Sequence, residues 1–390
     1  MISVEEARSL LFKLVSPLDV EEVPLSRANG RVLAREIVAR RNQPPFDASS
    51  MDGYAVRADE VERHAMFQVI GEAAAGHAFD GAVGPGQAVR IFTGAPVPEG
   101  ANFVVIQEDV SAKDRLITIT DDPGTKTNIR PQGADFSTGT TIDAPRRLRP
   151  QEIALLASMN VPVAPVTRRP VVALISTGDE LVMPGEEPTA DQIIVSNTFG
   201  LRAMLEELGA EVRVLPIASD TPASLKTTFG LARDADLVIT IGGASVGDHD
   251  LVAQVAAELG MDRSFYKIAM RPGKPLMAGR LGKAAMVGLP GNPVSAMVCG
   301  NLFVAPMIRA MLGLGTEMPR TLRARIAQPI GPNGPREHYM RAVVESGEIT
   351  AFDNQDSSLL TVLAAANALL VRPPRDPARA AGEEIAYLPL

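Results

Sequence analysis

The middle of the chain alternates between continuous apolar runs and amphipathic segments. Uninterrupted Val, Ile and Leu residues predict buried strands at residues 170–176, 211–218 and 236–243. Segments with helical periodicity follow them at residues 196–209, 221–235 and 250–260. Strands that are apolar on both faces and separated by helices indicate a parallel sheet covered on both sides. We therefore predict a central, doubly wound and mostly parallel α/β domain over residues 169–316.

The regions on either side of this domain have shorter patterns. Residues 44–145 contain short β-rich runs separated by Gly and Pro, which predict a β-rich inserted module. Residues 317–390 have similar runs and predict a small C-terminal β domain. The fold class is therefore α/β combined with β-rich regions in a multidomain chain.

Two further segments have helical patterns. Residues 1–40 begin with a capping box followed by apolar residues on one helical face. Residues 147–160 have a Pro near their start and a similar periodicity. We expect residues 1–43 and 146–168 to form one discontinuous, helical linker domain.

Composition narrows the class of protein. The formal net charge of −8 disfavours general nucleic-acid binding, because a phosphate backbone favours a basic face. No apolar run approaches the roughly 18 residues that cross a bilayer, and the acidic start of the chain does not resemble a secretory signal. The single cysteine, Cys299, excludes an intrachain disulfide and lies in an apolar stretch that predicts burial. These features favour a cytoplasmic protein without a membrane partner.

Three polar loops follow the predicted strands, at residues 176–180, 218–221 and 242–250. Ligands of open α/β sheets bind beyond the carboxyl ends of the strands, where these loops gather. The loops offer small residues whose backbone approaches an anion and carboxylates that hold Mg²⁺ through waters and phosphates. A single loop of this kind is often only a tight turn, but three at one edge favour a site. Its candidate residues are Glu180, Asp220, Gly242, Gly243, Ser245 and Asp250.

A basic loop follows at residues 267–275. Lys267, Arg271 and Lys274 fall within it beside Pro275, and they predict either a solvated surface turn or an oxyanion site. Asn292 precedes a Pro at a predicted helix start, so it caps that helix or meets a ligand phosphate.

The β-rich module has its own polar loops. They contain Asp52, Thr93, Arg130 and Asp135. Asp52 lies in a turn together with a second carboxylate, so turn stabilisation is the alternative to a functional role. The four histidines show no metal-ligand spacing, and His249 is expected at the surface or behind a site rather than on a metal.

Together these strings resemble the molybdopterin molybdenumtransferase family, which includes bacterial MoeA and the E domains of gephyrin and its plant counterparts. The strings that carry the resemblance are PPFDASSMDGYAVR, RIFTGAPVPEGANFVVIQED, STGDEL, GGASVGDHD, RPGKPL, GLPGNPVSA and, more loosely, NQDSSLLTVLAAANALL. They run in family order over nearly the whole chain. The resemblance implies insertion of molybdate into adenylylated molybdopterin with release of AMP, assisted by Mg²⁺ or a similar divalent cation. It also implies a homodimer whose cleft is shared between subunits.

The resemblance assigns roles to individual positions. The implied catalytic carboxylates are Asp52, Glu180, Asp220 and Asp250, of which Asp220 and Asp250 hold the metal. The implied substrate-binding positions are Thr93, Arg130, Asp135, Lys267, Gly242, Gly243, Ser245 and Asn292. The implied molybdate site consists of Arg271, Lys274, Pro275, Arg341 and Ser357. The chain departs from the family at Arg271, where Lys is usual, and at Ala134, where an acid often stands.

Two other functions fit parts of this pattern. A molybdopterin adenylyltransferase shares the doubly wound domain, but it lacks the β-rich module; such an enzyme is instead an expected partner that supplies substrate. A non-catalytic cofactor-binding scaffold would be favoured by loss of the carboxylates, and they are retained.

Overall fold

The computed structural model describes residues 1–243, 251–317 and 320–390, which form two compact units. The first unit contains residues 1–21, 30–34 and 166–390, and the second contains residues 22–29 and 35–165. Strands β1 (Val20–Pro24), β2 (Val32–Leu33) and β14 (Val163–Thr167) lie where the chain passes from one unit to the other.

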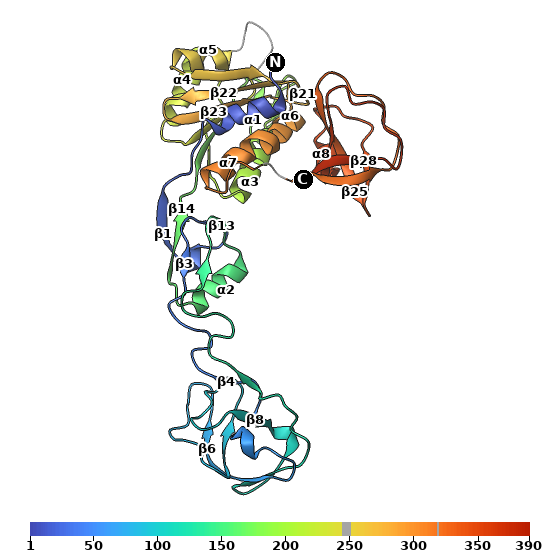
Figure 1. Ribbon diagram of the computed structural model, residues 1–390. Helices are drawn as coiled ribbons and strands as arrows, with labels where there is room; N and C mark the ends of the chain where they lie inside the picture. The colour runs from blue at the N-terminus through green and yellow to red at the C-terminus, as the bar shows by residue number, and fades with distance from the viewer. Residues whose placement is uncertain (244–250, 318–319) are drawn as a thin grey trace. The chain divides into compact units, whose positions relative to one another are not determined.

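A sheet that contains β22 and β23 forms the centre of the first unit (Figure 1). It has six strands, in the order β18-β15-β19-β23-β22-β20. Its strands are β15 (Val171–Ser176), β18 (Glu211–Val214), β19 (Leu237–Ile241), β20 (Asp262–Lys267), β22 (Pro275–Leu281) and β23 (Ala284–Leu289). The first four strands in spatial order are parallel to one another. Strand β22 is antiparallel to both of its neighbours, β23 and β20. The carboxyl ends of β15, β19 and β23 therefore meet at one edge.

Helices cover both faces of this sheet. One face carries α1 (Val4–Phe12), α3 (Asn197–Glu207), α6 (Pro293–Cys299) and α7 (Ala305–Met311), and the other carries α4 (Pro222–Leu231) and α5 (Leu251–Glu258). Along β15, Val172 and Leu174 pack into the first layer, whereas Ala173 and Ile175 pack into the second. Each large apolar side chain buried in this way contributes roughly 1.5–3 kcal/mol. The predicted doubly wound, mostly parallel sheet is confirmed.

The longest apolar helix lies inside this core. Helices α6 and α7 are joined through a π-helical turn, η4 (Gly300–Val304), into one helix over Pro293–Met311. It is long and apolar enough to cross a bilayer, although the sequence analysis predicts no apolar run of that length. However, 78% of the apolar stretch is buried inside the protein. Cys299 lies within it and is buried, as predicted.

A small barrel follows the central region. It contains β24 (Leu322–Ile326), β25 (Glu337–Glu345), β26 (Glu348–Ala351), β27 (Ala368–Arg372) and β28 (Glu384–Pro389), with α8 (Leu360–Ala365). Because β25 pairs with both β26 and β27, the ring of strands closes. Strand β21 (Met270–Arg271), from the predicted basic loop, pairs with β25 and sets Arg271 opposite His338. The C-terminal β region is therefore attached directly to that loop.

The second unit is mainly β structure, as predicted. Its largest sheet has the order β8-β5-β7-β6-β10-β9. The strands are β5 (Gly53–Val56), β6 (Met66–Ala73), β7 (Gln87–Ile91), β8 (Phe103–Ile106), β9 (Val110–Lys113) and β10 (Leu116–Ile119). Shorter elements are β3 (Ile37–Val38), β4 (Ala48–Ser49), β11 (Ile129–Arg130), β12 (Thr141–Ile142), β13 (Arg146–Arg147) and α2 (Pro150–Ser158).

The prediction of helix throughout residues 1–40 is wrong beyond Phe12. Helix α1 has its predicted cap, where the Ser3 hydroxyl accepts from the Glu6 N–H. After it, the chain forms short strands and a 3₁₀ turn, η1 (Leu25–Arg27). The apolar residues there are too few for a helical face, and Val32 and Leu33 are instead buried consecutively in β2.

Candidate functional site

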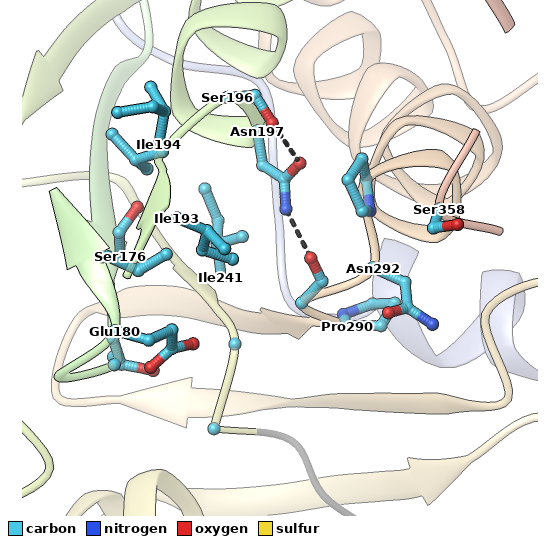
Figure 2. A pocket seen from close by; sticks show the side chains of 18 of the residues that line it. Ser176, Glu180, Ile193, Ile194, Ser196, Asn197, Ile241, Pro290, Asn292 and Ser358 are labelled. Carbon is cyan, nitrogen blue, oxygen red and sulfur yellow. Dashed lines mark hydrogen bonds between the residues drawn. The ribbon is translucent and has the colours of Figure 1, made fainter. Parts of the chain in front are cut away.

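A cavity of about 630 Å³ opens at the carboxyl ends of β15, β19 and β23 (Figure 2). All of its walls belong to the first unit. Six residues singled out from the sequence contribute to it: Glu180, Asp220, Gly242, Gly243, Pro275 and Asn292. The strand-end loops therefore converge, because parallel strands deliver their carboxyl ends to the same edge.

The floor of the cavity requires glycine. Gly242 and Gly243 have φ angles of +91° and +67°, which residues with a Cβ rarely adopt. A Cβ at Gly242 would lie 2.8 Å from the Thr177 carbonyl oxygen, and one at Gly243 would lie 2.4 Å from Val252 Cγ2. The buried hydroxyl of Thr177 has no hydrogen-bond partner within the described part of the chain. The floor thus offers backbone and one unsatisfied hydroxyl at close range.

Carboxylates gather on one wall. The Asp220 N–H donates to Asp179 Oδ1 at 3.2 Å. Partial withdrawal from solvent raises the pKa of Asp220, and the charges of Asp179 and Glu180 raise it further. A cation placed here would relieve this repulsion.

On the wall opposite the carboxylates, the side-chain amides of Asn197 and Asn292 join separate segments of the chain by hydrogen bonds. Asn197 Nδ2 donates to the Gly291 carbonyl oxygen at 2.7 Å, which ties the start of α3 to the loop before α6 (Figure 2). Asn292 stands at the N-cap position of α6 but makes no capping hydrogen bond. Its Nδ2 donates instead to the Ser357 hydroxyl at 2.9 Å. The capping alternative for Asn292 is therefore wrong, and its side chain links the central region to the C-terminal barrel.

Positive charge lies next to this link. Arg341, in β25, is 0% exposed, and one guanidinium nitrogen donates to the Asp356 carbonyl oxygen at 2.9 Å. The other two nitrogens, Nε and Nη1, are buried and have no partner among the described residues. Burial lowers the pKa of Arg341, and the neighbouring charge of Arg271 lowers it further. The arrangement leaves two buried N–H donors aimed at no protein acceptor.

The rest of the basic loop adjoins these residues. The Lys274 carbonyl oxygen accepts from the Ile268 N–H at 3.0 Å, and Pro275 lines the cavity. Lys267 is paired opposite Pro275 across β20 and β22. Its ammonium lies 5.2 Å from the centre of the Tyr266 ring.

Asp52 and Thr93 form a fixed pair in the second unit. Asp52 Oδ1 accepts from both the backbone N–H and the hydroxyl of Thr93, each at 2.8 Å. These two bonds, the backbone one foremost, lower the pKa of Asp52, and Arg90 adds to the effect. Arg90 is held between Tyr54 and Phe92, with ring centres 5.0 and 4.8 Å away. The carboxylate is therefore ionised and oriented.

The other two candidates of this unit lie on neighbouring backbone. Arg130, in β11, pairs opposite Ala48 in β4, and the Ser49 carbonyl oxygen accepts from the Gly94 N–H at 2.8 Å. This pairing brings the loops of Asp52, Thr93 and Arg130 to one side of the unit. The Asp135 N–H donates to Gln43 at 2.9 Å, in the next turn of the same segment.

Ser245 and Asp250, together with His249, lie outside the described residues. Across residues 1–243, 251–317 and 320–390, no group of three or more His, Cys, Asp or Glu side chains is arranged to hold a metal ion. Asp179, Glu180 and Asp220 carry hard oxygen atoms of the kind that Mg²⁺ prefers, but the three are not arranged as one such group; burial, and then the charges of Asp179 and Glu180, raise the pKa of Asp220.

Sequence reasoning assigned no role to Thr177 and Asn197, which line the cavity, or to Asp179, which lies beside it. Thr177 and Asp179 were inside a recognised loop, but their roles depend on which atoms stay unpaired after folding. Asn197 begins a predicted helix, and its contact with Gly291 joins residues 94 positions apart. No local sequence pattern predicts such a contact.

Comparisons with known proteins agree across the whole chain. Residues 2–160 match the MoeA N-terminal region (domain I and II), residues 173–310 a probable molybdopterin binding domain, and residues 323–390 the MoeA C-terminal region (domain IV). The molybdopterin molybdenumtransferase of Nostoc sp. is 36% identical, over 100% of this chain and 94% of its own. That of Haemophilus influenzae is 39% identical, over 80% and 78%. A solved molybdopterin biosynthesis MoeA protein from Pyrococcus horikoshii OT3 has 28% identity and a TM-score of 0.85, covering 100% of both chains.

Proposed function

Because this chain belongs to the MoeA family of molybdopterin molybdenumtransferases, we propose that it inserts molybdate into adenylylated molybdopterin and releases AMP. The full-length similarity to transferases favours this reaction over the smaller adenylyltransferase and over a non-catalytic scaffold. The observation that carries the proposal is the environment of Arg341.

Arg341 supports a site for a multivalent oxyanion. A buried guanidinium with two unpaired nitrogens is costly unless a ligand satisfies it. Molybdate is a tetrahedral dianion, so it accepts several charge-assisted hydrogen bonds at once. We assign its site to Arg271, Lys274, Pro275, Arg341 and Ser357. Positive charge from this group offsets the repulsion between molybdate and the substrate phosphates.

The adjoining cavity suits the nucleotide-activated pterin. The backbones of Gly242 and Gly243 allow close approach of a phosphate, and Asn292 and Lys267 supply further donors. We also assign substrate contacts to Ser245 and, from the second unit, to Thr93, Arg130 and Asp135. Asp52, whose pKa is lowered by its bonds to Thr93, and Glu180 position substrate or water.

A divalent cation fits the acidic wall. We propose that Asp220 and Asp250 hold Mg²⁺ or a similar ion, which supplies Lewis-acid polarisation of the phosphoanhydride when bound. Asp220 is suited to this role because its pKa is raised by burial and then by the charges of Asp179 and Glu180, a repulsion that a cation would offset.

We further propose a location, an oligomeric state and a partner. The chain acts in the cytoplasm as a homodimer with a shared cleft, since the candidate residues divide between two units. Its substrate is adenylylated, so an adenylyltransferase must act before it and is the expected partner. Neither nucleic acid nor a membrane is required.

The test is AMP release from adenylylated molybdopterin in the presence of molybdate and Mg²⁺. Arg341→Ala and Lys274→Ala should each raise the molybdate concentration needed for half-maximal insertion by about tenfold, as expected for loss of a charge-assisted bond. Excess molybdate should partly restore turnover. Lys226→Ala is the control. Lys226 lies outside this site and forms an ion pair with Glu258, with 2.8 Å between the ammonium nitrogen and the carboxylate oxygen. Unchanged half-saturation in both variants would remove the assignment of the oxyanion site, and absent AMP release by the parent protein would remove the function.

A further inference from the structure

A second cavity lies at the opposite end of the central sheet. It has a volume of about 330 Å³ and is formed by residues 13–16, 18, 233–236, 280 and 283 with Met311. These segments precede β19, join β22 to β23 and follow α1. The candidate site described above lies at the carboxyl ends of the parallel strands, so this cavity belongs to a different edge of the fold.

Four cationic side chains line it: Lys13, Arg233, Arg280 and Lys283. No carboxylate within the described residues lies within 4.0 Å of any of their nitrogens. The two acids of the cavity are paired elsewhere. Asp234 binds Arg213 at 2.5 Å, and Asp236 accepts two bonds from Arg168, each at 2.7 Å. Positive charge in the cavity is therefore not compensated by the protein, although the whole chain has a net charge of −8.

The walls are held by hydrogen bonds before any ligand arrives. Arg280 donates to the Leu14 carbonyl oxygen at 2.9 Å and to the Lys283 carbonyl oxygen at 3.3 Å. The Leu18 N–H donates to the Met311 carbonyl oxygen at 2.8 Å. Donors that are already in place lose less entropy when they bind a ligand. These bonds fix the Arg280 guanidinium and the segments that form the wall.

A cavity of about 290 Å³ adjoins it, and we call it the apolar cavity for the apolar side chains on part of its wall, although Lys226, Arg233 and Lys283 line it too. Its walls include Phe229, Val238, Leu259 and Leu281. Arg233 and Lys283 line both cavities, so they lie between the cationic space and the apolar one. Leu259 is 42% exposed, which leaves apolar surface available at the rim.

We propose that the paired cavities bind a small organic phosphate, with the phosphate among the four cations and an apolar or aromatic body against Phe229 and Leu281. A phosphate satisfies several N–H donors at once, whereas a carboxylate satisfies fewer. The apolar body leaves water, which adds affinity that inorganic phosphate lacks. The site is independent of the transferase reaction.

The test uses phenyl phosphate as the probe, by calorimetric titration of the full-length protein. An Arg341→Met background removes the other expected anion site. Phenyl phosphate should bind saturably and more tightly than inorganic phosphate, and phenol should not bind measurably. Arg233→Ala and Lys283→Ala should each weaken binding by about tenfold. Lys226→Ala is the matched control, since Lys226 lines the apolar cavity but is neutralised by Glu258, and it should change binding little.

Several outcomes would overturn the proposal. One is the absence of saturable binding at millimolar phenyl phosphate, and another is equal binding by the Arg233 and Lys283 variants. Leu259→Ser, on the exposed rim, should reduce the preference for phenyl phosphate over inorganic phosphate; an unchanged preference would remove the apolar half of the site. If Lys283→Glu changes the oligomeric state in sedimentation without changing phosphate binding, the face is an interface between copies rather than a ligand site. In the parent background, Arg233→Ala and Lys283→Ala should release AMP at the parental rate.

Discussion

Strand β25 carries two buried side chains with unsatisfied nitrogens, Arg341 and His338. Among the described residues, neither Arg341 Nε and Nη1 nor His338 Nε2 has a partner. They differ in what surrounds them. Arg341 adjoins the link between Asn292 and Ser357, whereas His338 pairs opposite Arg271 on one side and Arg372 on the other. A permanent charge with unpaired N–H donors suits ligand binding, whereas an imidazole among arginines stays neutral.

His338 should make the protein sensitive to acid. Burial, followed by the charges of Arg271 and Arg341, lowers the pKa of His338 from 6.5 to about 4. Because the folded pKa lies below the unfolded one, this stability is complete above pH 6.5 and is lost as pH falls towards 4. The loss corresponds to ~3 kcal/mol of unfolding free energy. His338→Gln should lose correspondingly less stability between pH 7 and pH 4 in urea titrations.

The control for this measurement is His77→Gln, because His77 is exposed. This variant should lose as much stability as the parent does when the pH falls from 7 to 4. Carboxylates titrate over the same pH range in every variant. Only the difference in unfolding free energy between the variants therefore reports on His338. Parallel acid profiles for the parent and His338→Gln would contradict the prediction.

Asp220 should behave in the opposite sense. Its pKa is raised, so its ionisation opposes folding, and the stability it contributes at low pH is lost as pH rises through the raised pKa. Asp220→Asn should therefore melt at the same temperature as the parent at pH 7, or slightly higher. It should also reduce divalent-ion-dependent AMP release by about tenfold or more.

Asp234→Asn is the matched control for Asp220. Asp234 is ion-paired with Arg213, and this bond lowers its pKa. Its replacement should reduce stability slightly at pH 7 and leave AMP release unchanged. A large loss of melting temperature in Asp220→Asn with normal turnover would make Asp220 structural.

At the scale of elements, the turn after β19 requires glycine at position 243 for two reasons, the backbone angle and the lack of space for a Cβ. Gly243 has φ +67°, and a Cβ there would meet Val252 Cγ2 at 2.4 Å and the Thr177 hydroxyl at 3.0 Å. Gly243→Ala should lower the unfolding free energy by about 1–2 kcal/mol from the backbone alone, and by more from the contacts. Urea denaturation measures the loss, and AMP release should fall with it.

Gly260→Ala separates the two contributions. Gly260 has φ +86°, but its Cβ would meet nothing within 4 Å. It should therefore show the backbone cost alone. An equal loss in the two variants would mean that the Gly243 contacts relax freely, and that the cavity floor tolerates a side chain.

How much of the fold is predictable differs between elements for a physical reason. Strands such as β15 and β19 are buried on both faces, so their apolar runs are continuous and visible. The two-residue strands β2 and β3 have almost no pattern, so the prediction of helix over residues 13–40 is wrong. The same limit holds for the site: strand-end loops were visible, but the links from Asn197 to Gly291 and from Asn292 to Ser357 exist only after folding.

At the scale of the whole molecule, the candidate residues divide between two units. Asp52, Thr93, Arg130 and Asp135 belong to residues 35–165, and the cavity belongs to the unit that contains residues 166–390. Under the proposed function, both sets of groups would have to meet at one substrate. A twofold dimer achieves this if each chain lends one set to the cleft of the other, because symmetry repeats every contact.

Heterodimers test this arrangement directly. Asp52→Ala and Asp220→Asn subunits carrying different affinity tags are mixed, and the heterodimers are purified through both tags. If the cleft is shared, one of the two sites in each heterodimer combines both defects and the other is intact, so about half of the parental AMP release returns. Heterodimers of Glu180→Gln with Asp220→Asn are the control: both changes lie in the same unit, each site keeps one defect, and activity should stay low. Heterodimers of the first kind that remain as inactive as their parents, or a parent protein that sediments as a monomer while active, would show that one chain completes its own site.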